Sequence, residues 1–71
     1  MTPLEAGAMT LRERAKTLDA VTAEFRRVRA RSTHIGRVDD LSTIDTRIFL
    51  YTELASQCRC LADALDPPEP P

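Results

Sequence analysis

Residues 41–66 read LSTIDTRIFLYTELASQCRCLADALD, and their apolar side chains recur at the spacing of an amphipathic α-helix. Ser42 and Asp45 are spaced as in a capping box, and the proline that follows Asp66 disfavours further helix. The pattern therefore predicts a helix over about 43–65. Its apolar stripe contains two seven-residue series, which are Leu41, Ile48, Ala55 and Ala62, and Ile44, Tyr51, Cys58 and Leu65.

The segment before residue 36 carries a matching stripe. One series consists of Leu4, Leu11, Leu18 and Phe25, and a second, four residues later each time, consists of Ala8, Ala15 and Thr22. Two helix starts fit this segment, one at Thr2 and one at Thr10, because each threonine has a glutamate three residues on. The stripe runs in phase through both starts, which favours a continuous helix over 3–35, whereas Gly7 favours a break and a helix over 11–35 after a short extra N-terminal helix.

The connection between the two stripes is short. Gly36 is placed to end the first helix in a left-handed conformation, and Asp40 competes with Ser42 as the cap of the second. A turn over 36–42 makes the neighbouring helices antiparallel. The sequence therefore predicts an all-α fold, a two-helix hairpin over residues 1–66 followed by a disordered proline-rich tail over 67–71.

A hairpin of this size needs a further surface to pack against. A chain of 71 residues removes only a modest share of its surface from water, and two helices enclose no core. Cys58 and Cys60 point about 200° apart on a helix, so they cannot pair with each other, and we expect both to be reduced. We therefore expect the hairpin to complete a helical bundle by dimerisation or by docking on a partner, with the second helix the more buried. The predicted packing residues are Leu11, Leu18, Val21, Phe25, Val28, Ile44, Ile48, Tyr51, Leu54, Cys58, Leu61 and Leu65.

Charge is divided between the two halves of the chain. Residues 10–37 carry a net charge of +5 and residues 38–71 a net charge of −5, while the whole chain carries −1. The arginines at 26, 27, 29 and 31 point around the helix in different directions, whereas a nucleic-acid groove requires cations on one face. We therefore expect pairing between the helices, with Arg27 and Arg31 as candidate contacts to an acidic partner or to phosphate.

Further single residues carry weaker signals. Phe49 and Cys60 fall on the face opposite the main stripe and are candidates for a secondary contact. His34 is the only histidine, so zinc ligands at workable spacing are lacking.

No catalytic, metal, cofactor or small-molecule motif is present, and no segment reads as a membrane span or a secretory signal. We expect a non-catalytic cytoplasmic protein, and nine arginines against one lysine are typical of a GC-rich bacterial or phage source.

These observations lead to one functional expectation and two alternatives. The expectation is a small structural or interaction protein (an assembly factor, adaptor or masking inhibitor) that binds itself as a homodimer or a larger protein assembly through its amphipathic helices. The first alternative is a nucleic-acid-binding regulator with a Rop-like hairpin-dimer architecture, an analogy of shape that no residue motif carries. The second is a subunit whose helices fold only on a partner.

Overall fold

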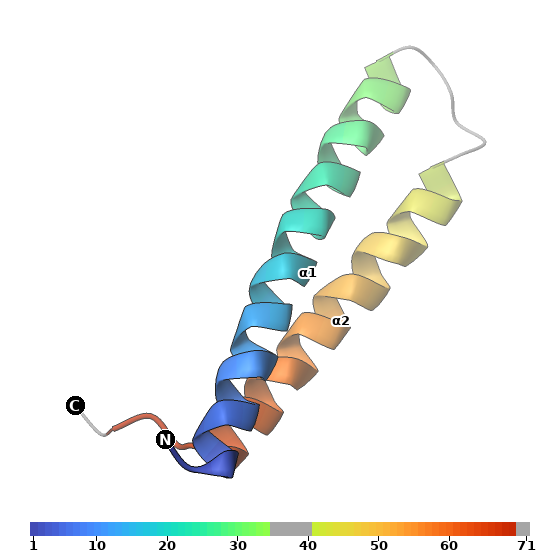
Figure 1. The fold of residues 1–71 in the computed structure, drawn as a ribbon. Coiled ribbons are helices and arrows are strands. Elements are labelled where there is room, and N and C mark those ends of the chain that lie inside the picture. The colour runs from blue at the N-terminus through green and yellow to red at the C-terminus, as the bar shows by residue number, and fades with distance from the viewer. Residues whose placement is uncertain (35–40, 70–71) are drawn as a thin grey trace.

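Two antiparallel helices lie side by side in a single layer in the computed structural model of the chain (Figure 1). It describes residues 1–34 and 41–69, with only the backbone described for residues 33 and 34. Helix α1 spans Pro3–His34 and helix α2 spans Leu41–Leu65. The prediction of an all-α antiparallel hairpin is confirmed.

Helix α1 begins at the first of the two candidate starts and continues without interruption. The hydroxyl oxygen of Thr2 accepts a hydrogen bond from the Glu5 amide at 3.2 Å, which satisfies one of the orphan donors of the first turn. Thr10 lies inside the helix, where its hydroxyl donates to the carbonyl of Ala6 at 3.1 Å. A threonine in the interior of a helix can satisfy its hydroxyl in this way, so Thr10 does not act as a second cap.

Helix α2 begins two residues earlier than the expected start at residue 43. Ser42 therefore lies within its first turn, and the Ser42 carbonyl accepts a hydrogen bond from the Thr46 hydroxyl at 2.9 Å. The helix ends as expected, with the Asp66 amide donating to the Ala62 carbonyl at 2.9 Å and residues 67–69 outside the helix. The predicted roles of Gly36 and Asp40 fall outside the described residues.

The most deeply buried positions between the helices hold small side chains, and we call this row of positions the seam. Ala8 and Ala15 of α1 are at most 1% exposed, as are Ala55 and Ala62 of α2. Thr22 continues the α1 series and is also buried, and its hydroxyl is satisfied by donating to the Leu18 carbonyl at 2.7 Å. No large side chain is fully buried among the described residues. The seam thus brings the two backbones together while enclosing little apolar volume.

The expectation that the second helix is the more buried is wrong for the chain alone. Phe49, Leu50, Leu54 and Leu61 of α2 are each at least 45% exposed. Ala55 and Ala62 are the α2 residues that point at α1, so the leucines of the same stripe point away from the seam. The apolar stripe of α2 is therefore wider than the contact it makes within the hairpin.

Because the seam is filled by small side chains, we predict that one larger side chain placed there will force the helices apart. Replacing Ala55 with leucine overfills a position that is 1% exposed, which we expect to lower the free energy of unfolding by about 1–3 kcal/mol. The matched control is Ala64→Leu on the exposed side of α2, where a change within about 0.5 kcal/mol is expected. Denaturant unfolding followed by circular dichroism at one protein concentration measures both. Equal effects of the two substitutions would contradict a close seam.

Gly7 yields a prediction of opposite sign. A methyl group built on Gly7 meets the Leu65 Cδ1 atom at 3.5 Å, which is an ordinary contact. Alanine is favoured over glycine inside a helix, so Gly7→Ala should raise the free energy of unfolding by about 0.5–1 kcal/mol. A loss of stability in the same measurement would show that α1 requires glycine at this point.

Candidate interaction surface

The seam divides the hairpin into two broad sides of different chemistry. On α1, Arg12 and Leu18 lie about 60° to either side of Ala15, and on α2, Arg59 and Cys58 lie on opposite sides of Ala55. Because the helices are antiparallel, the polar edge of α1 adjoins the polar edge of α2, and the apolar edges adjoin likewise. We call the first side the ionic face and the second the apolar face.

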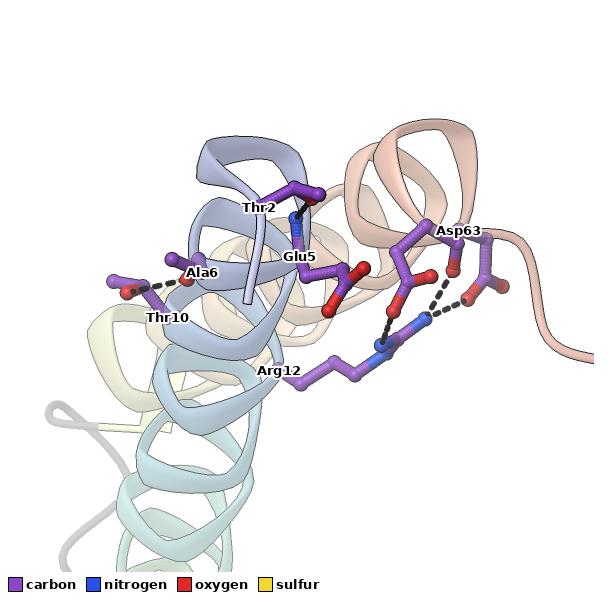
Figure 2. Close-up of polar contacts among 7 residues, drawn as sticks. Thr2, Glu5, Ala6, Thr10, Arg12 and Asp63 are labelled. Atoms are coloured by element: carbon purple, nitrogen blue, oxygen red, sulfur yellow. Dashed lines mark hydrogen bonds and ion pairs between the residues drawn. The ribbon is translucent and has the colours of Figure 1, made fainter.

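Arg12 is the main contact of the ionic face (Figure 2). Its guanidinium donates to the Asp63 carboxylate at 3.2 Å, to the Asp66 carboxylate at 3.3 Å and to the Asp66 carbonyl at 2.7 Å. These hydrogen bonds raise the pKa of Arg12, with Asp63 as the largest contributor. A cation at the carbonyl end of α2 also complements the helix dipole. Arg12 therefore fastens the first third of α1 to the end of α2.

Two further ion pairs join the helices along the ionic face. Arg59 pairs with Asp19 near the middle of the hairpin, and Arg29 pairs with Asp45 towards its other end. The hydrogen bond that Arg29 donates to the Asp45 carboxylate raises the pKa of Arg29. Exposed pairs of this kind contribute little stability, but they favour one register of the two helices. The ionic face thus pairs its charges within the chain.

The apolar face presents large side chains along both helices. Leu11 and Leu18 are half-buried against the seam, whereas Leu4 and Leu61 are each 57% exposed and Leu54 is 45% exposed. No acidic residue belongs to this face. Its members are Leu4, Leu11, Leu18, Val21, Phe25 and Val28 of α1, and Tyr51, Leu54, Cys58, Leu61 and Leu65 of α2.

An aromatic cluster occupies one half of the apolar face. The rings of Phe25 and Tyr51 stack with centroids 5.5 Å apart and an interplanar angle of 13°. The guanidinium of Arg47 lies 6.0 Å from the centroid of the Phe25 ring. A cation over a ring face is favourable, and the long arginine stem covers apolar surface. Arg47 thus borders the apolar face and is partnered from within it.

The predicted packing residues lie around the seam and across the apolar face. Ile44 is buried, seven of the others are half-buried, and Val21, Leu54, Leu61 and Leu65 are exposed. The set omitted the residues that form the seam, which are Ala8, Ala15, Thr22, Ala55 and Ala62. Their seven-residue spacing was visible in the sequence. Their small size was the missing signal, since small residues at a repeated position allow two helices to approach closely.

The two candidate contacts for an acidic partner or phosphate lie on the outside of α1. Arg27 pairs with Glu24 one turn earlier, and this hydrogen bond lowers the pKa of the Glu24 carboxyl. Arg31 is exposed and adds a smaller electrostatic contribution to the same lowering. Arg29, between them in sequence, points to α2 instead. The arginine run therefore divides between two sides of α1 and forms no single basic stripe.

The remaining candidates are not brought together. Phe49 is 63% exposed and Cys60 is exposed, and three helical turns separate them on the outer side of α2. Both cysteines are free thiols. Across residues 1–34 and 41–69 no group of three or more His, Cys, Asp or Glu side chains is arranged to hold a metal ion. The side chain of His34 lies outside the described part of the chain.

Comparison with known proteins adds no relative. The chain matches no protein-family model, no curated protein and no solved structure. Neither of the two described helices combines the length and apolar character needed to cross a membrane.

Proposed function

We propose that this protein is a non-catalytic interaction protein, acting as an assembly factor, adaptor or masking inhibitor, that binds a protein surface through its apolar face. The observation that carries the proposal is the contrast between the seam and that face. The seam buries alanines, while Leu4, Leu54 and Leu61 remain about half exposed on one side of the hairpin. Soluble proteins rarely leave apolar patches larger than a few hundred Å² uncovered.

The distribution of charge supports the same side as the binding surface. The arginines and aspartates of the ionic face are occupied by pairs within the chain, such as Arg12 with Asp63. The apolar face has no acidic member, and Arg47, which lies along it, is engaged with Phe25. A binding surface with an apolar centre and a polar rim is typical of protein interfaces. Amphipathic helices commonly bind through leucines spaced at helical intervals, as Leu54 and Leu61 are.

The proposal predicts that binding depends on the apolar face and not on exposed apolar residues elsewhere. A tagged chain carrying Leu54→Glu with Leu61→Glu should lose at least about tenfold in capture both of an untagged co-expressed copy and of proteins from its native host, because two charges would be buried. The matched control is Phe49→Glu with Ala64→Glu, which adds the same charge on the outer side of α2.

Quantitative mass spectrometry of the captured material, with circular dichroism of each variant, provides the measurement. Retained capture by the control and loss by the face variant is the expected result. Equal capture by both variants would contradict an interaction role for the apolar face.

A further inference from the structure

We infer that the occupant of the apolar face is a second copy of this chain, packed two-fold on the first as a four-helix bundle. The inference rests on the proposed function and specifies its partner. It requires that the face be the right width, length and charge for another hairpin.

The width of the face calls for an occupant two helices wide. In a triangular bundle a third helix would lie about 60° from the seam direction, whereas in a square bundle the next layer lies at about 90°. Leu54 and Leu61 point about 100° and 120° from the seam position of Ala55, and Val21 points about 120° from that of Ala15. A single helix lying in the groove would leave these side chains in water. A second layer of two helices covers them.

The area of the face matches a stable dimer. Helix α2 has 25 residues and is therefore about 37 Å long, and two helices of about 10 Å diameter side by side make a layer about 20 Å wide. Their product is roughly 750 Å² for each copy, or roughly 1,500 Å² for a pair, which is within the range of a standard stable interface. A second hairpin has the same length and width, so it covers the face from end to end.

The charge of the chain permits self-association. Each copy carries a net charge of −1, so two copies repel only weakly. The face itself has no acidic member. Arg14 and Arg47 are exposed and point towards the second layer as Leu54 does, because Arg14 precedes Ala15 and Arg47 precedes Ile48 by one residue, but they lie on different helices at different levels. A two-fold interface brings the same patch of each copy together, which an apolar surface tolerates and a surface of one charge sign does not.

Sedimentation equilibrium under reducing conditions, at about 1–100 µM protein, tests the inference directly. The wild-type protein should sediment with twice the 7.9 kDa mass of one chain. Leu54→Glu with Leu61→Glu should raise the dimer dissociation constant at least about tenfold. Phe49→Glu with Ala64→Glu should leave it dimeric. A wild-type chain that is helical and monomeric at 100 µM would overturn the inference.

A second measurement covers the case in which the face variant does not fold. In an equal mixture of isotope-labelled and unlabelled wild-type chains, isotope-filtered nuclear Overhauser spectra should show contacts between copies at Leu54, Leu61 and Leu18. Contacts at Phe49 in place of these would overturn the inference.

The inference of a second copy can be refuted while the proposed interaction role still stands. If the wild-type chain is monomeric, yet capture of a host protein is lost by the face variant and kept by its control, the second copy is refuted and the interaction role stands. If the wild-type chain is monomeric and capture is equal for both variants, the second copy and the interaction role are both refuted.

Discussion

The close approach of two helices over alanine is the constraint on which the rest of the structure depends. Ala8, Ala15, Ala55 and Ala62 fill the seam, and a buried methyl group contributes only about 0.8 kcal/mol. Ordering each residue of two helices costs about 1–2 kcal/mol, so the alanines of the seam offset only a small part of the cost of ordering the hairpin. Because the alanines occupy the direction of the partner helix, the leucines of both stripes are turned to one side. We propose that the further burial comes from that side.

The two sides of the hairpin divide orientation from binding. Arg12, Asp19 and Arg29 of α1 each meet a group of opposite charge on α2, which sets the register of the helices without adding much stability. The opposite side has leucines and one aromatic stack, and it has no acidic member. This separation is consistent with the proposal that the apolar face binds another protein while the ionic face contacts solvent. It is the arrangement expected of half a helical bundle.

Much of the fold could be predicted from the sequence, because both stripes are long and strictly periodic. The stripe passed Gly7 in phase, which favoured a continuous first helix, whereas Gly7 itself favoured a break. The structure decides between them, with one continuous helix and its cap at Thr2. The assignment of side chains to seam or open face could not be predicted. Period alone gives the angle of Leu54 and of Ala55 on α2 but not which of the two points at α1, and the predicted packing set names Leu54 and not Ala55. The particular ion pairs were also unpredictable, because they depend on the register of two helices.

The central claim is that the hairpin owes its stability to whatever covers the apolar face, and that this is a second copy. Thermal unfolding of the wild-type chain, followed by circular dichroism over a hundredfold range of protein concentration, tests it most directly. Unfolding of a dimer releases two chains, so the midpoint temperature should rise steadily with concentration. A cooperative transition of a helical chain whose midpoint is the same at every concentration would contradict the claim.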